Sequence, residues 1–419
     1  MKLTTYPQHQ SLHDSGVEWI GEIPTTWKVR RGKWLFSKED RPVRPSDEIV
    51  TCFRDGVVTL RSNRRTEGFT NALKEHGYQG IRKGDLVIHA MDAFAGAVGV
   101  SDSDGKSTPV YSACVPREAG TVDPHFYAYY MRHIALSGVL VALAKGIRER
   151  STDFRFNDFA DLCLAMPPYC EQQAIVAFLD GKCAKIDEAV GIKETEIALL
   201  RERRQILIHQ AVTSGLNPDA PMKESGIDWI GQIPAHWEVK SIRYAFRFRN
   251  NQRIPLSGSE REHRQGEYPY YGASGIIDYV DDYIYDEDLI LIAEDGANLL
   301  SKSTPLAFVA RGKYWVNNHA HILEPLFPGF EYWAELLSAC DYTIHISGSA
   351  QPKLTRDRLG GVRIPVPPEG ERLAIISIIN EQSAKIHNAI GVKQSQIAAL
   401  KEYRTSLINA AVTGKIKVI

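Results

Sequence analysis

Apolar residues recur at steps of three and four, or multiples of these, along two long segments of the chain. This spacing places them on one face of an α-helix, so each segment predicts a long amphipathic helix with coiled-coil character. The first helix is predicted over residues 174–213, and Lys182, Lys193 and Arg204 occupy the remaining positions of its seam. The apolar or small seam residues are 175, 179, 186, 189, 197, 200, 207 and 211 in the first segment, and Ile375, Ile379, Ile386, Ala389, Ile397, Leu400, Leu407 and Ala411 in the second.

Shorter apolar runs between turn-forming residues predict a mixture of strands and helices for the rest of the chain. Residues 85–90 and 289–293 are apolar after a short polar turn, and both predict a buried strand. Residues 127–133 and 332–339 predict short helices. The chain is therefore expected to be α+β rather than purely helical.

The chain carries the same sequence pattern twice. Residues 15–30 (SGVEWIGEIPTTWKVR) recur as residues 225–240 (SGIDWIGQIPAHWEVK), at an offset of 210. Residues 167–213 align without gaps on residues 367–413, at an offset of 200. An internal repeat of this kind indicates two copies of one architecture. The regions between the repeats share only scattered similarity, so we predict one scaffold that carries two different heads.

The repeated segments also suggest how the scaffold is assembled. The seam of a long helix needs an apolar partner, and the nearly identical seam of its duplicate is the natural one. Antiparallel pairing of the two copies would generate a pseudo-two-fold arrangement with the heads at opposite ends. The alternative is that each helix packs only on its own head. The entry motif W-I-G-x-I-P-x-x-W is expected to cover a core rather than to bind a ligand, because its Trp and Ile anchor while Gly and Pro turn the chain.

The repeat divides the chain into four parts. We predict a first head over residues 1–165, which includes the entry motif 15–30, and a first helical spacer over residues 166–224. A second head is predicted over residues 225–365 and a second spacer over residues 366–419. The predicted fold is thus α+β, with two mixed α/β heads separated by two long helices that pair as an antiparallel coiled coil.

Composition fits this picture and excludes several classes of protein. With 419 residues, 43% hydrophobic and 24% charged, the chain is too long for one ordinary domain and suits a globular protein with several cores. Its polar start does not resemble a signal peptide, and its longest nearly apolar run, residues 135–144, is too short to cross a bilayer. The six cysteines form no C-x-x-C pair, so reduced and mostly buried thiols in the cytoplasm are expected.

The net charge of −1 conceals local clusters of one sign. Residues 28–65 hold eleven Lys or Arg against five Asp or Glu, and residues 240–264 hold seven against two. Residues 278–295 hold eight acidic residues and no basic one. A binder of nucleic acid needs positive charge on one face rather than over the whole chain, so this distribution leaves such binding open.

Polar loops just before each Pro-Pro pair provide candidate DNA contacts. Lys and Arg can hold phosphates there, and Arg, Gln or Asn can read bases. The alternative is a plain solvated loop. The candidates are Lys145, Arg148, Arg150 and Arg155 in the first head, and Gln351, Lys353 and Arg356 in the second.

Two further segments of the second head, residues 268–275 and 314–321, place aromatic residues beside Asn and His. These side chains can stack on bases and bond base edges. Structurally, Tyr270, Tyr271 and Trp315 would more often be sheet core, and Asn317-Asn318 could equally form a turn. The candidate DNA-binding residues of these segments are Tyr271, Ser274, Asn317, Asn318 and His319.

Motifs for catalysis are incomplete. Met166-Pro-Pro-Tyr169 is similar to the Asn/Asp-Pro-Pro-Tyr/Phe loop of amino-methyltransferases, but Met cannot accept hydrogen bonds from a target amine, and the duplicate has Val366 there. A helix start explains both copies. No G-x-G-x-x-G, F-x-G-x-G or G-x-x-x-x-G-K-[ST] loop is present for a nucleotide-like cofactor or ATP.

Metal-dependent chemistry is equally poorly supported. Asp228 with Glu238 and Lys240 is similar to a nuclease D…E-x-K pattern, yet the first copy lacks the second carboxylate. His319 and His321 have the spacing of metal ligands on a strand, but no third ligand stands out. The sequence therefore predicts a binder with no catalytic residues, cofactor or metal of its own.

The Pro-Pro pair followed by Glu171-Gln172, the long helix, the entry motif and the in-frame duplication together resemble the specificity subunit of type I restriction–modification enzymes. Residues 268–275 and 314–321 also resemble that family's target-recognition domains. The likeness covers nearly the whole chain. One departure is Glu371-Arg372 in the second copy, which is not expected to disturb the fold.

The resemblance implies that each head is a target-recognition domain that reads one half of an asymmetric, interrupted DNA sequence through the major groove. The paired helices, about 60 Å long at 1.5 Å per residue, would set the unread spacer and dock two modification subunits. Those subunits would carry S-adenosylmethionine and methylate adenine at N6. Two restriction subunits, where present, would add ATP- and Mg-dependent translocation and cleavage.

Two other functions remain open on the residues alone. A stand-alone DNA methyltransferase or nuclease would modify or cut DNA without a partner. A non-DNA scaffold on a duplicated coiled coil would show no change in sequence preference on substitution of Arg148, Gln351 or Lys353.

Overall fold

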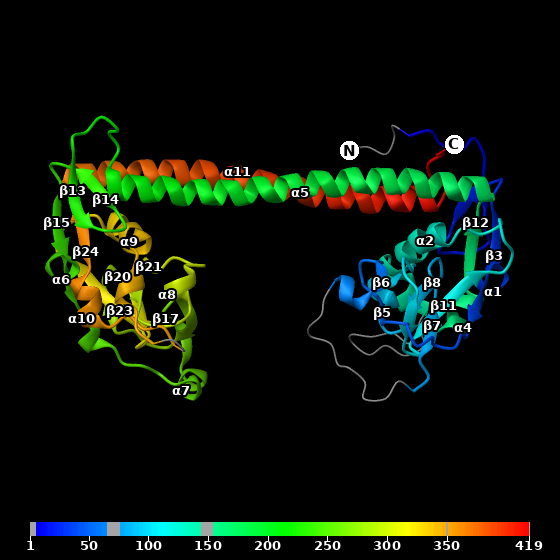
Figure 1. Ribbon diagram of the computed structural model, residues 1–419, viewed down its shortest axis with the longest axis horizontal. Helices are drawn as coiled ribbons and strands as arrows, with labels where there is room; N and C mark the ends of the chain where they lie inside the picture. Colours follow the sequence, from blue (N-terminus) through cyan, green and yellow to red (C-terminus); the bar gives the residue numbers. More distant parts are fainter. Residues whose placement is uncertain (1–5, 65–75, 144–153, 349–350, 419) are drawn as a thin grey trace. The chain divides into compact units, whose positions relative to one another are not determined.

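A computed structural model of the chain describes residues 6–64, 76–143, 154–348 and 351–418, which form two compact units. The first unit runs to Lys193 and resumes at Gln394, and the second is Glu194–Lys393. The helices α5 (Tyr169–Ser214) and α11 (Glu369–Val412) therefore contribute one half to each unit (Figure 1). Each unit thus consists of a head and two half-helices.

The head of the first unit is built around a four-stranded antiparallel sheet in the order β4-β11-β8-β9. The ladder of β3 with β12 ties the start of the head to its end, directly before α5. The elements before α5 are β1 Leu12–Asp14, β2 Glu22–Pro24, β3 Lys28–Arg31, α1 Gly32–Leu35, β4 Phe36–Glu39, β5 Val50–Cys52, β6 Val58–Leu60, η2 Arg61–Asn63, β7 Gln79–Ile81, β8 Leu86–His89, η3 Ala93–Ala95, β9 Val98–Val100, β10 Gly105–Ser107, β11 Tyr111–Pro116, α2 Pro124–Leu136, α3 Val139–Leu143, α4 Phe156–Asp161 and β12 Cys163–Met166.

The second head repeats this plan with the sheet β16-β23-β20-β21 and the ladder of β15 with β24. It adds a second sheet, β18-β17-β22-β19, in which β17 and β22 are parallel. The elements before α11 are β13 Met222–Ile227, β14 Gly231–Pro234, β15 Glu238–Ser241, α6 Ile242–Ala245, β16 Phe246–Phe248, η4 Asn250–Gln252, α7 Gly258–His263, β17 Gln265–Gly272, β18 Gly275–Val280, β19 Tyr285–Asp286, β20 Leu289–Ala293, α8 Asn298–Ser301, β21 Ala307–Ala310, β22 Lys313–Val316, β23 Ala320–Pro325, α9 Phe330–Ala339, η5 Thr343–His345, α10 Arg356–Gly361 and β24 Arg363–Val366.

The predicted buried strands are confirmed as β8 and β20, and the predicted short helices as α2 and α9. Strand β20 is apolar throughout because both of its faces are covered. Ile290 and Ile292 lie in the core beneath α9, whereas Leu289 and Leu291 lie in a separate core with residues of β22 and β23. A strand covered on both faces reads as a continuous apolar run rather than an alternating one.

The long helices begin earlier than the apolar spacing predicted. Helix α5 starts at Tyr169 rather than at residue 174, because the carbonyl of Pro168 accepts hydrogen bonds from the backbone N–H groups of Glu171 and Gln172, at 2.9 and 3.0 Å. The first seam residue, Ile175, comes only in the second turn. Every predicted seam position of both helices is buried or half-buried, so the seam itself is confirmed.

Within each unit the two half-helices lie side by side and antiparallel (Figure 1). In the second unit Glu196 pairs with Lys393 at 2.7 Å, and Arg204 bonds Ser383 at 3.1 Å, so residue numbers rise on one helix as they fall on the other. In the first unit Arg404 pairs with Asp187 of α5 at 2.9 Å. The predicted antiparallel pairing is confirmed.

The entry motif covers a core in both units, as predicted. Trp27 and Trp237 are almost fully buried. The long helices end beside them: a β-carbon on Gly414 would lie 3.3 Å from Trp27, and one on Gly215 would lie 3.1 Å from Trp237. Both glycines have positive φ, which lets the chain leave the helix with no side chain against the indole. The C-terminal ends of α11 and α5 are thus seated on the first and second entry motifs respectively.

Two expectations from composition can be compared with the structure. Four of the six cysteines, Cys52, Cys114, Cys183 and Cys340, are buried, whereas Cys170 is exposed. Within the described ranges, no helix combines the length and the apolar character that crossing a membrane requires.

Candidate nucleic-acid interface

The central strand of the second head, β20, leads into two carboxylates where predicted site residues converge. Asp295 pairs through both carboxylate oxygens with Nδ1 of His319, at 2.9 and 3.0 Å. The backbone N–H of Glu294 donates to the carbonyl of His319 at 2.9 Å. A β-bridge between Asp295 and Lys353 brings the loop before α10 to the same place. His319 and Lys353, far apart in sequence, therefore lie around one acidic pair.

The turn between β22 and β23 presents two of the predicted residues to solvent and uses a third to hold itself together. Oδ1 of Asn317 accepts the backbone N–H of His319 at 2.8 Å, and its own N–H donates to the carbonyl of Tyr271 at 3.0 Å. Asn317 is only 6% exposed, whereas Asn318 and His319 are exposed. Asn318 and His319 are therefore the side chains of this turn that a ligand can reach.

Tyr271 adjoins this turn but is largely engaged in packing. Its ring lies 5.5 Å from that of Phe308 and 5.6 Å from that of Tyr314, and burial raises the pKa of its phenol. Tyr270 and Trp315 are buried in the sheet core, as the structural alternative predicted. Tyr271 is half-buried, so one part of its ring remains accessible.

Glu294 holds three positively charged or polar groups around it. Arg253 donates to it at 2.7 Å, and Lys353 and His321 lie 3.5 Å away. Burial alone would raise the pKa of Glu294, but the hydrogen bond from Arg253 and the nearby charges hold it below its ordinary value. Glu294 is thus ionised at neutral pH and fixes Lys353 beside the exposed turn.

His321 is part of the core that supports this surface. Its Nε2 must donate to the carbonyl of Leu354 at 2.7 Å, and its Nδ1 then accepts from the side-chain amide of Asn250 at 2.8 Å. Burial lowers the pKa of His321. The neutral tautomer satisfies both nitrogens, so the pair His319 and His321, considered as metal ligands from their spacing, have separate partners.

Three other predicted residues of the second head lie at the edges of this cluster. Ser274 is exposed in the turn between β17 and β18, and Gln351 is exposed in the loop before α10. The guanidinium of Arg356 lies over the ring of Phe248, with 5.4 Å to the ring centroid. The structure thus unites Asn317, Asn318, His319 and Lys353, with Tyr271 adjacent to them. DNA contact by all of these residues stays a prediction.

In the first head, Lys145, Arg148 and Arg150 lie outside the described residues. Arg155 is exposed at the start of α4, where its backbone N–H donates to the carboxylate of Asp158 at 2.8 Å. Its predicted role therefore stays a prediction as well.

An acidic position that the sequence did not single out occurs at the same place in both heads. Asp92 follows the central strand β8, as Asp295 follows β20, at an offset of 203. Asp92 accepts from Arg54 at 2.8 Å and lies 3.1 Å from His89. The similar segments DLVIHAMD and DLILIAED carry this signal, but only the fold shows that each carboxylate meets basic side chains.

Comparison with known proteins agrees with this architecture. Residues 234–394 match the family model described as "Type I restriction modification DNA specificity domain". Over 95% of its length the chain is 23% identical to the putative type I restriction enzyme MjaX specificity subunit of Methanocaldococcus jannaschii, 96% of which is covered. Residues 234–394 therefore match a type I restriction modification DNA specificity domain, and the chain is similar over nearly its whole length to a specificity subunit of that kind.

A second relative is the putative type I restriction enzyme specificity subunit S.HindORF215P of Haemophilus influenzae, 37% identical over 139 residues. That match spans 32% of this chain and about a third, 34%, of the relative. A chain from the structural work on complex assembly and conformational transition of the type I R-M system has a TM-score of 0.67 at 14% identity, covering 93% of this chain and 98% of that one. The HsdS subunit of Thermoanaerobacter tengcongensis has a TM-score of 0.51 at 15% identity, covering 94% and 98%. These likenesses show a shared fold.

The exchange of Gln172 for Arg372 between the two copies of the repeat leaves the scaffold intact. Gln172 is fully buried and donates to the carbonyls of Thr121 and Pro167, at 3.1 and 2.9 Å. In the second copy Arg372 donates to the carbonyls of Pro328 and Pro367, at 3.1 and 2.6 Å. Both side chains thus tie the Pro-Pro pair to the loop before α2 or α9, so the exchange of Gln for Arg conserves the contact.

The residues of the weakly supported catalytic patterns have structural roles. Met166 and Val366 end the strands β12 and β24, directly before the helices. Glu238 pairs with Lys240 at 3.0 Å along β15. Among the residues that the structure describes, no group of three or more His, Cys, Asp or Glu is placed to hold a metal ion.

Proposed function

We propose that this chain is the DNA-specificity subunit of a type I restriction–modification complex, that it reads a bipartite, asymmetric DNA sequence, and that it carries out no chemistry itself. Each head would read one half of the target through the major groove. The observation that carries the proposal is that the two units share one scaffold yet place different side chains around equivalent acids. His319 faces Asp295 in the second head, whereas Arg54 and His89 face Asp92 in the first.

These side chains have the chemistry that base reading needs. A carboxylate accepts from the amino group of cytosine, Asn bonds adenine at two atoms, and Arg bonds guanine at two atoms. Asp295 and Asn318 offer the first two in the second head, and Asp92 with Arg54 offers the first and third in the first head. Different combinations at equivalent places would give two different half-targets.

Cations at the edge of the second surface would hold the DNA backbone. The side chain of Lys353 is 52% exposed although Glu294 lies beside it, and Arg356 lies at the start of α10. Phosphate contacts of this kind fix register and orientation but carry no sequence information. Such contacts make the affinity for DNA fall with rising salt. The logarithm of the binding constant decreases by about 0.9 per phosphate neutralised for each ten-fold increase in salt concentration.

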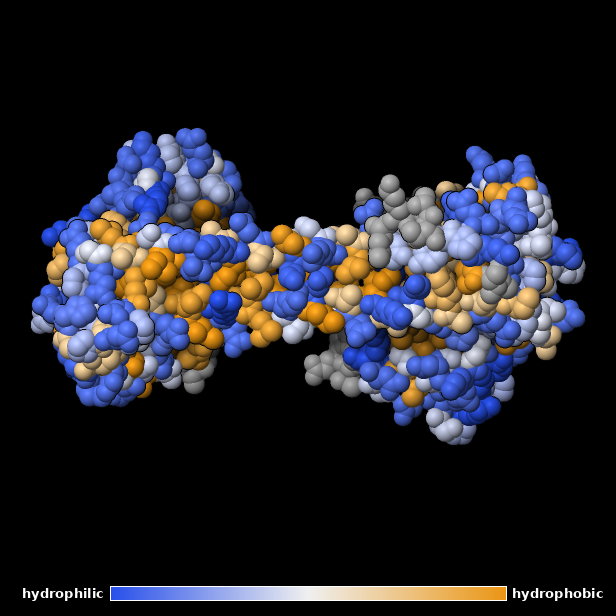
Figure 2. All heavy atoms as spheres, turned by 90° about the horizontal axis from the view of Figure 1, so that it is seen from above, coloured by the Kyte–Doolittle hydropathy of each residue, from blue (hydrophilic) through white to orange (hydrophobic). Residues whose placement is uncertain are grey.

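The paired helices would set the spacer between the two half-targets and dock two modification subunits. Two copies of the same partner need two equivalent surfaces on this chain. Two pairs of exposed apolar residues repeat between the copies. Ile192 and Val392 are 54% and 55% exposed at an offset of 200, and Trp34 and Tyr244 are 67% and 68% exposed at an offset of 210. Figure 2 shows hydrophobic residues among hydrophilic ones on the exposed surface of the helices. S-adenosylmethionine, ATP and Mg²⁺ would belong to the partner subunits.

The experiment that tests this proposal compares the chain with and without a modification subunit. Methylated adenines are mapped across the genome of cells that express both subunits, or either one alone. The proposal predicts N6-methyladenine in one interrupted, asymmetric sequence, and only when both subunits are present. Methylation or cleavage by the purified specificity subunit alone would contradict it and support a stand-alone enzyme.

A further inference from the structure

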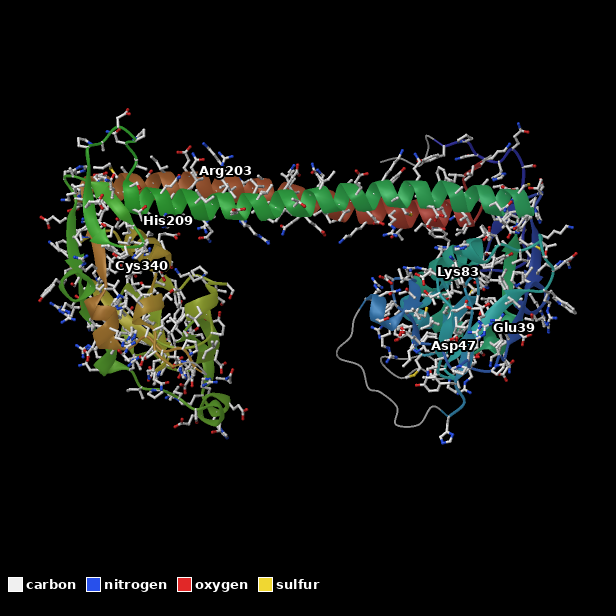
Figure 3. All side chains as sticks on the ribbon, viewed as in Figure 1. Glu39, Asp47, Lys83, Arg203, His209 and Cys340 are labelled. Carbon is white, nitrogen blue, oxygen red and sulfur yellow. The ribbon has the colours of Figure 1, made fainter. Side chains whose placement is uncertain are left out.

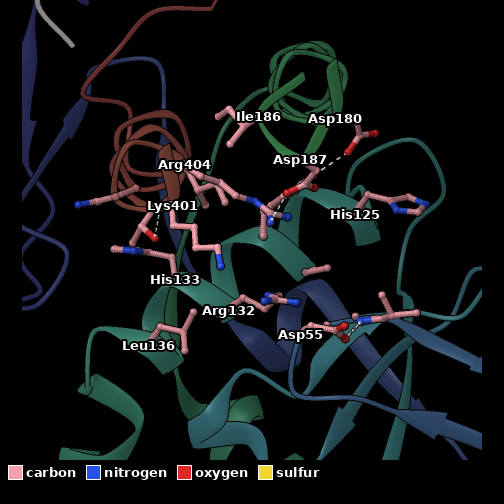
Figure 4. Close-up of a pocket in the computed structure, with 18 of the residues that line it drawn as sticks. Asp55, His125, Arg132, His133, Leu136, Asp180, Ile186, Asp187, Lys401 and Arg404 are labelled. Carbon is pink, nitrogen blue, oxygen red and sulfur yellow. Dashed lines mark hydrogen bonds and ion pairs between the residues drawn. The ribbon is translucent and has the colours of Figure 1, made fainter. Parts of the chain in front are cut away.

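The first unit contains a cavity of about 680 Å³ between α2, the N-terminal half of α5 and the C-terminal half of α11 (Figure 4). Its apolar wall includes Val57, Leu136 and Ile186, and its polar lining includes Arg132 and Lys401. Cavities that hold small ligands are typically of this size, with apolar walls and a few convergent polar groups. None of Arg54, His89 and Asp92, the residues proposed to read DNA in the first head, lines the cavity.

Arg132 is the unusual residue of this cavity. Within the described ranges it makes no hydrogen bond and no ion pair, although burial lowers the pKa of its guanidinium. The side chain lies across Gly56, where an added β-carbon would come within 1.7 Å of the guanidinium nitrogen Nη1. The absent side chain of Gly56 thus leaves the space that Arg132 occupies. An unpaired cation in such a place is costly unless an anion joins it.

The carboxylates of the cavity have other partners. Asp55 is the acid with the largest effect on the pKa of Arg132, but both of its oxygens bond Arg64. The other two acids lie on α5, where Asp180 bonds Tyr129 of α2 and Asp187 pairs with Arg404 of α11 (Figure 4). The three pairs are Asp55 with Arg64 (2.6 Å), Asp180 with Tyr129 (2.7 Å) and Asp187 with Arg404 (2.9 Å).

The second unit differs from the first at the equivalent junction of head and helix. Arg204, the duplicate of Arg404, pairs with Glu335 of α9 at 3.4 Å. The two heads are aligned by equivalent ring contacts, Phe36 with Tyr127 in the first and Phe246 with Trp333 in the second.

This alignment sets an offset of 206 between α2 and α9, so Glu335 corresponds to Tyr129 and Ser338 corresponds to Arg132. Ser338 is satisfied by the backbone of Ala307, at 2.9 and 3.0 Å. Arg132 therefore stands where the second unit has a neutral serine. The two acids that α5 contributes to the first unit, Asp180 and Asp187, are paired with Tyr129 and Arg404.

We propose that this cavity binds an organic anion, a phosphate or carboxylate group carried on an apolar body. Arg132 and Lys401 bind the anionic group, and Val57, Leu136 and Ile186 contact the apolar part. The anion neutralises the charge of Arg132, which has no hydrogen-bond or ion-pair partner among the described residues. It belongs either to a free small molecule or to the acidic side chain of a bound polypeptide.

Calorimetric titration of the purified full-length chain with phenyl phosphate and with inorganic phosphate, at constant ionic strength, tests the proposal. Phenyl phosphate is expected to bind at one site and more tightly than inorganic phosphate, because only the former contacts the apolar wall. Arg132→Met is expected to weaken binding at least ten-fold. The control Arg203→Met removes an equal charge from an exposed side chain of α5 that projects into solvent (Figure 3) and is expected to leave binding unchanged.

The proposal is overturned if the wild-type chain shows no saturable binding, or if Arg132→Met binds phenyl phosphate as the wild type does. Misfolding is checked by thermal unfolding. Since Arg132→Met removes an unpaired, partly dehydrated charge, its unfolding midpoint should equal or exceed that of the wild type without ligand. Lys401→Met, on the other side of the cavity, should weaken binding in the same direction and provides a second, independent variant.

The source of the anion is distinguished in a further arm, which alone rests on the proposed function. Phenyl phosphate is titrated into the chain after assembly with a modification subunit. Loss of binding on assembly identifies an acidic side chain of the partner polypeptide as the natural anion, and Arg132→Met should then weaken assembly. Retained binding identifies a small molecule. Failure of the subunits to assemble contradicts the proposed function and leaves the first titration as the test of the cavity.

Discussion

At the scale of single residues, the second head depends on a histidine that stays neutral. Burial lowers the pKa of His321 below its ordinary value near 6.5, so the unfolded chain takes up a proton before the folded one does. The stability that His321 contributes is therefore present above pH 6.5 and is lost as the pH falls. Protonation would also place a donor on Nδ1, facing the amide of Asn250.

We expect the thermal unfolding midpoint of the second head to decrease as the pH is lowered from 7.5 to 5.5. His321→Gln should make this decrease smaller. Thermal unfolding followed across this range checks the prediction. His263→Gln, an exposed histidine of the same head, is the control and should keep the slope of the wild type. An unchanged slope in His321→Gln would show that another group titrates.

Asp295 provides a prediction about specificity. Asp295→Asn preserves size but turns an acceptor-only group into a donor and acceptor, so recognition of the base that it contacts should change by about 1–3 kcal/mol. We expect methylation to alter or relax in the second half-target and to stay the same in the first. Mapping of methylated adenines checks this.

Asp92→Asn should have the reciprocal effect on the first half-target. The control Asp228→Asn changes an exposed acid of the second entry motif and should leave both halves intact. If complexes that contain Asp295→Asn or Asp92→Asn still methylate the wild-type sequence, the two carboxylates have only structural roles.

The candidate site was partly predictable from residue types. Asn318, His319 and Lys353 were selected because they can bond bases or phosphates, and the fold brings them together. Asp295 was missed because it lies in an acidic run, which argues against DNA binding as long as its partners are unknown. Asn317 shows the opposite limit, because its amide is used within the turn and only coordinates reveal that.

At the scale of elements, hydrophobic periodicity predicted both long helices and every seam position. The start of α5 was missed because the first turn is fixed by the carbonyl of Pro168 rather than by apolar residues. The second sheet of the second head was also missed. Its strands pair across long sequence separations, such as Tyr270 with Trp315, and local pattern carries no information on such pairs.

The helices carry a testable weakness at Gly191 and Gly391. Neither glycine has a neighbour within 4 Å of an added β-carbon, so Ala fits at both sites without a clash. Each substitution should raise the free energy of unfolding by up to about 1 kcal/mol, the difference in helix propensity between the two residues. Chemical denaturation measures the change.

Gly32→Ala is the matched control, because its β-carbon would lie 2.2 Å from the carbonyl oxygen of Phe159. It should destabilise the first head. A loss of stability in Gly191→Ala or Gly391→Ala would instead indicate that these positions need a glycine for a reason other than space.

At the scale of the whole chain, the internal repeat was the most informative feature of the sequence. It predicted two heads on a shared scaffold, and both heads have the same sheet order and the same ladder before the long helix. It could not predict where the copies differ in structure. Arg132 lies at the junction of head and helix in the first unit, and Glu335 lies at the equivalent junction in the second. Only alignment of the two folds reveals this difference.

The central claim is that each head reads its half of the target independently of the other. The direct measurement is a map of methylated adenines in cells that express a modification subunit with a chain whose residues 31–165 come from a different specificity subunit. The account predicts a new first half, while the second half and the spacer length stay as they were. A map in which both halves change, or neither does, would contradict it.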